Sequence, residues 1–291
     1  MQKEQYLRKP PWLRIKMTTS PEYMDVKRLM RNQKLNTVCE HAGCPNMHEC
    51  WGQHKTATVM ILGEICTRNC HFCSVEHGKP NSPDPEEPNR VAESVSILGL
   101  KHVVITMVTR DDLKDSGAGV ITNTVITVRK QNPTCSIELL TSDLGGIPNN
   151  IKGVIASQPE ILSHNLETIR RLSPIIRPEA DYERSLDFFR IASETGNVML
   201  KSSLMIGLGE KMEEINQSMN DLRKAGVSIL NIGQYLQPTR KHLPVQKYWH
   251  PDEFKKMKKI ALKMGFKFCE AGPLVRSSYH AAEQYNEIHS N

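Results

Sequence analysis

Six of the eight cysteines in this 291-residue chain lie within residues 39–73. They form two groups with different spacings, which we call the first triplet (Cys39, Cys44 and Cys50) and the second triplet (Cys66, Cys70 and Cys73). Cysteines this dense constrain the fold, because each group has to gather around a common partner. Three thiolates can hold a cubane iron–sulfur cluster by three of its irons and leave the fourth iron open. Two triplets therefore predict two clusters, and chemistry beyond plain electron transfer.

A structural zinc site is the alternative interpretation, since four-cysteine zinc sites also bring thiols close in sequence. Zinc knuckles usually pair one CxxC unit with a second CxxC unit or with two histidines, and neither triplet contains two CxxC units. His41, His48 and His71 lie among the cysteines and could be ligands, although a polar loop histidine is more often only solvated. The spacing favours iron–sulfur ligation at both triplets.

The composition is that of a globular enzyme, with 38% hydrophobic and 24% charged residues. The length allows one large domain or two smaller ones. No apolar run approaches the ~20 residues that cross a bilayer, and the first eight residues, MQKEQYLR, resemble neither a signal peptide nor an import leader. We therefore expect a cytoplasmic protein that does not bind membranes. In that reducing compartment, clustered cysteines serve as metal ligands rather than disulfides.

The net charge of +6 is modest, and its largest local source is the lysine run at residues 255–259. This run lacks the interleaved aromatic residues of a nucleic-acid patch, so we expect no nucleic-acid partner. A mildly basic surface would equally suit an acidic protein partner. Charge alone does not decide the function.

Strand-like and helix-like segments alternate through most of the chain. Residues 1–56 show little periodicity and predict an extension, and the two prolines within residues 9–12 exclude a helix interior there. The pattern predicts strands at residues 56–62, 103–107, 136–140, 160–165, 198–206 and 229–235, and helices at residues 91–100, 182–195, 211–225 and 251–264. Six such strands predict an α/β fold, a partial (β/α)6 TIM-type barrel. The last 25 residues or so are expected to form a tail.

The second triplet lies in the segment CTRNCHFC, with Phe72 just before the last cysteine, and resembles the signature of the radical S-adenosylmethionine superfamily. In that superfamily a reduced 4Fe–4S cluster passes one electron to S-adenosylmethionine bound at its open iron. The resulting 5′-deoxyadenosyl radical takes hydrogen from unactivated C–H bonds. The cofactor carries this difficult step, and the protein supplies positioning and exclusion of water. The resemblance implies this pair of cofactors at the second triplet.

The first triplet, just upstream, narrows the resemblance to the lipoyl synthase family. Further segments that resemble this family span nearly the whole chain: KPPWL at 9–13, RDDL at 110–113, HNLET at 164–168, GLGE at 207–210, QYLQPT at 234–239 and GPLVRSSY at 272–279. The resemblance implies a sulfurtransferase that inserts two sulfur atoms, at C6 and C8 of an octanoyl chain on a carrier lysine. It implies one S-adenosylmethionine for each position, and a second, auxiliary 4Fe–4S cluster on the first triplet that donates both sulfurs and is consumed.

In this family the serine before the tyrosine of the C-terminal motif binds the fourth iron of the auxiliary cluster, which here corresponds to Ser278. Without the resemblance, an ordinary polar C-terminal loop is the preferred interpretation. The resemblance implies three parts: an extension at 1–56 with the auxiliary-cluster cysteines, a partial barrel at 57–250, and a C-terminal helix and tail at 251–291. The tail would carry the serine ligand and close over the auxiliary cluster.

Contacts to S-adenosylmethionine are expected from residues at the barrel mouth. By resemblance to the superfamily, Phe72 should lie near the adenine. Asn165, Arg177 and Lys201 follow or lie in predicted strands, so they are candidates for holding the methionine end. For Arg177 and Lys201, ordinary surface charge is the alternative. The isolated Cys135 and Cys269 are expected to be buried thiols that behave as small apolar residues.

Two other functions stay open. One is a different radical sulfur-inserting enzyme, similar to biotin synthase, that acts on a free small molecule. The other is an electron carrier without catalysis, although the roughly 200 residues after Cys73 would then lack a purpose. The partners implied by the resemblance are octanoylated carrier domains, either acyltransferase subunits of 2-oxoacid dehydrogenases or the glycine-cleavage H protein. An electron donor and a cluster-rebuilding protein are also implied.

Overall fold

The computed structural model describes residues 7–15, 20–52, 58–196 and 198–289, and a mixed sheet of eight strands forms the centre of this part of the chain. Strand β1 is antiparallel to β2, and every other neighbouring pair is parallel. The strands follow one another across the sheet as β1 (Asn36–Thr37), β2 (Thr58–Ile61), β5 (His102–Met107), β6 (Ser136–Leu140), β7 (Ile161–Ser163), β8 (Met199–Ile206), β9 (Ile229–Gln234) and β10 (Phe268–Gly272). A separate parallel pair consists of β3 (Ile65–Cys66) and β4 (Glu76–His77).

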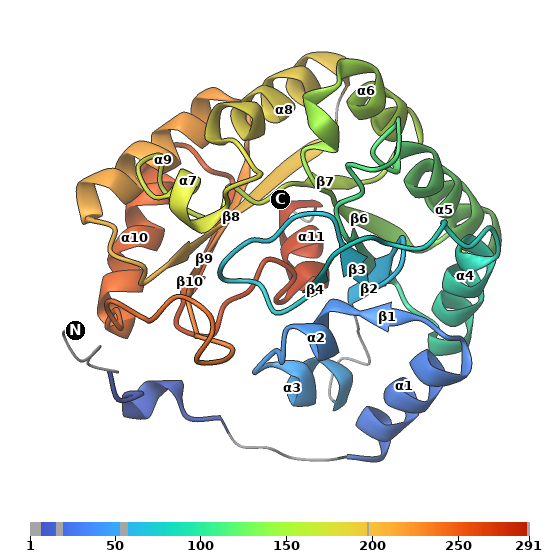
Figure 1. The fold of residues 1–291 in the computed structure, drawn as a ribbon, viewed down its shortest axis with the longest axis horizontal. Helices are drawn as coiled ribbons and strands as arrows, with labels where there is room; N and C mark the ends of the chain where they lie inside the picture. Colours follow the sequence, from blue (N-terminus) through green and yellow to red (C-terminus); the bar gives the residue numbers. More distant parts are fainter. Residues whose placement is uncertain (1–6, 16–19, 53–57, 197, 290–291) are drawn as a thin grey trace.

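Helices cover the outer side of this sheet in an arc (Figure 1). Each helix of this arc comes after a parallel strand in the chain. They are α4 (Glu87–Leu98), α5 (Ala118–Gln131), α6 (Pro148–Ala156), α8 (Tyr182–Thr195), α9 (Met212–Lys224) and α10 (Pro251–Lys263). The helix α11 (Ala281–His289) lies inside the arc and contacts β5 (Figure 1). The remaining helical segments are η1 (Pro11–Leu13), α1 (Pro21–Asn32), α2 (Val38–His41), α3 (Met47–Gly52), η2 (Leu144–Gly146) and α7 (Ser173–Ile176). No helix in the described ranges combines the length and the apolar character needed to cross a bilayer.

This arrangement confirms the partial TIM-type barrel. Six strand–helix units run from β2 to α10, and the sheet stays open because β1 and β10 are its two edges. Strands β2 and β9 are buried along their whole length, as expected for parallel strands with helices on one face and a filled interior on the other. Since every unit returns the chain to the same end, the carboxyl ends of the parallel strands lie together and form the barrel mouth.

Most expected elements are confirmed, with shifted ends. The strand expected at 56–62 is β2, although residues 56 and 57 lie outside the described part of the chain. The helix expected at 91–100 begins earlier, at Glu87, because Pro88 fits the first turn of a helix. It ends at Leu98, and the next residue, Gly99, has a left-handed φ of 61°. The helix expected at 182–195 has those bounds, and Asp181 caps it, because its carboxylate accepts a 2.7 Å hydrogen bond from the backbone amide of Arg184.

Besides several short segments, the barrel helices α5 and α6 and three elements outside the expected barrel were not predicted. Within the expected extension, α1 buries Tyr23, Val26 and Met30, which have the helical spacing of three and four residues. Within the expected tail, β10 adds a seventh parallel strand by pairing with β9 from Phe268↔Ile229 to Gly272↔Gly233, and α11 follows. The strand β10 is short and contains a glutamate and a glycine, so its stability comes from the pairing with β9 and not from an apolar pattern.

The barrel interior contains a buried ion pair. The Lys201 ammonium on β8 lies 3.0 Å from the carboxylate of Glu138 on β6, and Ser163 on β7 donates a 3.0 Å hydrogen bond to the same carboxylate. The side chains of Lys201 and Glu138 are 1% and 0% exposed. Removing one partner would leave a buried, uncompensated charge.

We expect Glu138→Gln to lower the free energy of unfolding by about 3–5 kcal/mol, because the buried ammonium of Lys201 then loses its counter-ion. Urea denaturation of the metal-free protein measures this effect. As a control, Asp25→Asn removes the partner of Arg28 in an exposed pair, where the expected cost is about 1 kcal/mol or less. Equal effects of both substitutions would contradict the structural importance of the interior pair.

Candidate active site

The second triplet begins at Cys66, the last residue of β3, and continues with Cys70 and Cys73 on the loop between β3 and β4. This loop follows the carboxyl end of β2 and therefore lies at the barrel mouth. Two other mouth segments hold it in place, since His71 N donates to the carbonyl of Ile176 at 2.9 Å and a ring nitrogen of His242 lies 3.0 Å from the carbonyl oxygen of Cys73. All three cysteine side chains of the triplet are half-buried.

The thiols of the second triplet lie close enough to influence one another. Burial raises the pKa of Cys70 to about 12 and that of Cys73 to about 11, and the neighbouring Cys66 adds to both shifts. The thiols of Cys70 and Cys73 are thus protonated at neutral pH in the metal-free protein. Because metals bind thiolates, metal binding here has to release protons.

Polar side chains from the segment after β7 lie beside the second triplet. Arg177 is buried, donates to the carbonyl of Leu166 at 2.7 Å, and lowers the pKa of Cys70 by its charge, against the larger effect of burial. The negative charge of Glu167 has the opposite effect and raises the pKa of both Cys70 and Cys73. Asn165 donates a 2.9 Å hydrogen bond to Glu167, and its own buried Oδ1 has no partner among the described residues. These groups are available to a ligand bound next to the second triplet.

The other two candidates for cofactor contacts lie in different surroundings. Phe72 is half-buried and packs against the hydrophobic core at the loop. Lys201 lies in the middle of the sheet and its ammonium is engaged by Glu138. The structure thus brings Asn165 and Arg177 to the second triplet, and places Lys201 in the barrel interior.

The first triplet lines a cavity of about 150 Å³ together with Ser278. Cys39 comes from α2, Cys44 from the turn after it and Cys50 from α3, whereas Ser278 comes from the other end of the chain. The Oγ1 of Thr58, at the start of β2, donates a 2.8 Å hydrogen bond to the Ser278 hydroxyl. The fold therefore collects the three thiols and this serine around one space.

Several contacts hold the C-terminal segment over this cavity. The Asn231 side chain on β9 donates to the carbonyls of Arg276 and Ser277, both at 2.9 Å. A Cβ atom at Gly233 would lie 2.1 Å from the carbonyl oxygen of Val275, so only glycine permits this close approach. From the other side, Asn46 donates to the carbonyl of Leu274 at 2.7 Å.

The cavity has the chemistry of an iron–sulfur cluster site. Burial raises the pKa of Cys39 to about 11 and that of Cys50 to about 12, and it also raises that of Cys44. Arg276 lines the same cavity, and its charge favours the thiolate of Cys44. A half-buried guanidinium beside three thiols suits a bulky group of negative charge, which the thiolates and sulfides of a cluster supply.

A single metal ion fits less well. Within the described ranges, no three His, Cys, Asp or Glu side chains come close enough together to hold one ion. The thiols of the first triplet instead surround a space. The two triplets are separate sites connected by short contacts, among them a 2.5 Å hydrogen bond from the Ser74 hydroxyl to the carbonyl of His41.

Sequence analysis assigned no role to Glu167, Arg276 or Thr58. Glu167 and Arg276 belong to the quoted segments HNLET and GPLVRSSY, and the position of Arg276 two residues before Ser278 was an available signal. Thr58 gave no such signal, since its hydrogen bond to Ser278 spans 220 positions of the chain.

Comparison with known proteins agrees with this geometry. The family model described as the radical SAM superfamily matches residues 60–222, and that of the N-terminal domain of lipoyl synthase matches residues 1–44. Lipoyl synthase of Halalkalibacterium halodurans is 60% identical over 98% of this chain and 94% of its own length. Lipoyl synthase of Geobacillus thermodenitrificans is 58% identical over 98% of this chain and 96% of its own length.

Among solved structures, methylornithine synthase aligns with a TM-score of 0.56 at 13% identity, over 87% of this chain and 79% of its own. This likeness concerns the fold alone. Membership in the radical S-adenosylmethionine superfamily brings S-adenosylmethionine and a 4Fe–4S cluster as cofactors. The relatives, the two family matches and the two cysteine sites together show that this chain is an enzyme of the lipoyl synthase family, within the radical S-adenosylmethionine superfamily.

Proposed function

We propose that the chain inserts two sulfur atoms, at C6 and C8 of an octanoyl group amide-linked to a carrier lysine, and so forms the lipoyl group. It would use two S-adenosylmethionine molecules and draw both sulfurs from an auxiliary 4Fe–4S cluster. The observation that carries the proposal is the cavity that joins the first triplet to Ser278, separate from the second triplet at the barrel mouth. One site for radical generation and one for sulfur supply is the division that this chemistry needs.

At the mouth, Cys66, Cys70 and Cys73 would hold the 4Fe–4S cluster, whose chemistry is one-electron reduction of S-adenosylmethionine to a carbon radical. The chain itself binds and orients the cofactor. The unpartnered Oδ1 of Asn165, the carboxylate of Glu167 and the guanidinium of Arg177 would hold its polar groups, and Phe72 would pack against its adenine. Lys201 would support the S-adenosylmethionine site only indirectly, because its ammonium is already paired with the carboxylate of Glu138.

In the cavity, Cys39, Cys44, Cys50 and Ser278 would hold the auxiliary cluster. An alkoxide oxygen is a harder ligand than a thiolate, so the iron on Ser278 would be the easiest to lose. Such a ligand suits a cluster that is dismantled to release sulfur. We propose the corresponding three parts of the chain, 1–56, 57–250 and 251–291, with β10 of the third part completing the sheet.

The substrate in this proposal is an octanoylated carrier domain, from an acyltransferase subunit of a 2-oxoacid dehydrogenase or from the glycine-cleavage H protein. A reducing protein would supply electrons, and a cluster-rebuilding protein would restore the auxiliary cluster after each turnover. The barrel mouth is where the acyl chain has to enter, since it leads from the second triplet into the interior.

An anaerobic single-turnover assay tests the proposal. Reconstituted protein, dithionite, S-adenosylmethionine and an octanoyl-lysine peptide are mixed, and peptide mass and released iron are followed together. We expect a mass gain of two sulfur atoms, accompanied by iron release. A peptide of unchanged mass, despite cleavage of S-adenosylmethionine, would refute the proposed substrate.

Ser278→Ala should lower the yield of doubly sulfurated peptide by about tenfold or more, because the fourth iron of the auxiliary cluster loses its protein ligand. Mass spectrometry of the peptide measures this yield. The matched control is Ser277→Ala, since Ser277 is bound through its backbone carbonyl and its side chain is not part of the cavity lining. Full yield from Ser278→Ala would show that the ligand assignment is wrong.

A further inference from the structure

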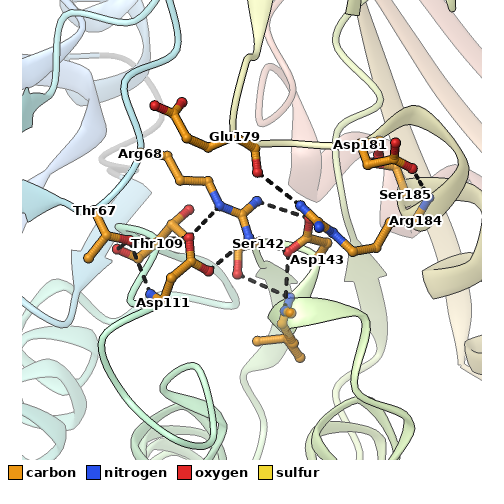
Figure 2. Close-up of polar contacts among 12 residues, drawn as sticks. Thr67, Arg68, Thr109, Asp111, Ser142, Asp143, Glu179, Asp181, Arg184 and Ser185 are labelled. Atoms are coloured by element: carbon orange, nitrogen blue, oxygen red, sulfur yellow. Dashed lines mark hydrogen bonds and ion pairs between the residues drawn. The ribbon is translucent and has the colours of Figure 1, made fainter. Parts of the chain in front are cut away.

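Three residues separate Cys66 from Cys70, and hydrogen bonds tie each of them to the barrel. Figure 2 shows those of Thr67 and Arg68. The amide of Thr67 donates to the carbonyl of Thr109 at 3.0 Å. The amide of Asn69 donates to the carboxylate of Glu179 at 3.2 Å. Between them, the side chain of Arg68 points toward the carboxylates of Asp111 and Asp143 (Figure 2).

Arg68 makes two bidentate ion pairs. Its Nε and Nη2 donate to the two carboxylate oxygens of Asp111 at 2.7 and 2.8 Å. Its Nη1 and Nη2 donate to the two oxygens of Asp143 at 2.9 and 2.7 Å. Asp111 follows β5 and Asp143 follows β6, so one side chain links the loop of the second triplet to two neighbouring strands. Bidentate pairs fix the orientation of both groups as well as their distance.

Burial makes this arrangement rigid. The side chains of Arg68 and Asp143 are 5% and 0% exposed. Arg184, from the first turn of α8, donates to Asp143 at 2.7 Å and shares the buried carboxylate. Burial opposes the charge of Asp143, but hydrogen bonds from Arg68 and Arg184 outweigh it and lower the pKa of this carboxyl. The carboxylate thus stays ionised, and the loss of either partner would leave a buried charge.

We propose that Arg68 is a positioning residue, which fixes the backbone between Cys66 and Cys70 against the ends of β5 and β6. It would thereby hold the second triplet in one orientation relative to Asn165, Glu167 and Arg177. The inference rests on the proposed role of the second triplet as the site of S-adenosylmethionine cleavage. It does not depend on which substrate receives the sulfur.

Cleavage of S-adenosylmethionine without an octanoyl substrate is the activity to measure, in Arg68→Gln, Arg68→Lys and the control Arg129→Gln. Arg129 also makes a bidentate pair, with Glu160, at 3.0 and 3.1 Å and remote from the loop. We expect kcat to fall by about 10- to 100-fold in Arg68→Gln, with a smaller change in KM, because misplacement by about 1 Å costs rate at this scale. The kcat of Arg68→Lys should lie between those of Arg68→Gln and the unsubstituted protein, since lysine keeps the charge but not the bidentate geometry.

Hydrogen exchange of the metal-free protein gives a second measurement that does not depend on cofactors. In Arg68→Gln and Arg68→Lys, amides of residues 66–73 should exchange faster, whereas those of β5 and β6 should keep their protection. Activity within twofold of the unsubstituted protein in both variants would overturn the proposal, as would an equal loss in Arg129→Gln. If the chain cleaves S-adenosylmethionine but leaves an octanoyl peptide unchanged, the proposed function fails while the role of Arg68 is still tested.

Discussion

Replacing Cys70 with alanine is expected to abolish both S-adenosylmethionine cleavage and sulfur insertion. Cys70 is the central ligand of the proposed cluster at the barrel mouth, and two thiolates cannot hold three irons of a cubane. The measurements are 5′-deoxyadenosine and peptide mass under anaerobic, reducing conditions, together with the iron content of the reconstituted protein. We expect both 5′-deoxyadenosine and sulfurated peptide to fall to background. The iron content should fall by the amount that one cluster contributes.

The matched control for this loss is Cys135→Ala. Cys135 is 2% exposed and lies just before β6, so its replacement removes a buried thiol without touching either triplet. It should cost about 1 kcal/mol of stability and leave both activities in place. If Cys70→Ala still produced 5′-deoxyadenosine, the second triplet would not be the site of radical generation.

Cys44→Ala is expected to separate the two activities. This residue lines the cavity with Ser278, so its loss should prevent assembly of the auxiliary cluster and reduce sulfur insertion to background. Cleavage of S-adenosylmethionine should persist within a few-fold, because Cys66, Cys70 and Cys73 stay intact. The same assay measures both products, and the iron content should again fall by the share of one cluster.

Cys269→Ala is the control here, since Cys269 is a 1% exposed thiol on β10, in the same C-terminal part of the fold as Ser278. It should support both activities. If Cys44→Ala lost both products while Cys269→Ala kept them, the two triplets would not have separate roles. Such a result would favour one composite site over the proposed division into radical generation and sulfur supply.

Much of the fold was predictable because it depends on local patterns. The strands β5, β6, β8 and β9 are apolar runs between polar loops, and the helices α8, α9 and α10 repeat apolar residues every three or four positions. The helix α1 carried the same signal, in Tyr23, Val26 and Met30, although it was not predicted. The short strand β10 carried no such signal, since its partner β9 lies more than 30 residues earlier.

The cysteine spacings by themselves predicted two metal–sulfur sites, because ligand type and separation limit which groups three nearby thiols can hold. Folding decided how those sites are completed. Ser278 meets Thr58 beside the first triplet, and Arg68 meets Asp143, only because the parallel sheet brings together segments that are 220 and 75 positions apart. The burial of Lys201 against Glu138 was decided in the same way, since exposure and charge pairing depend on neighbours across the sheet.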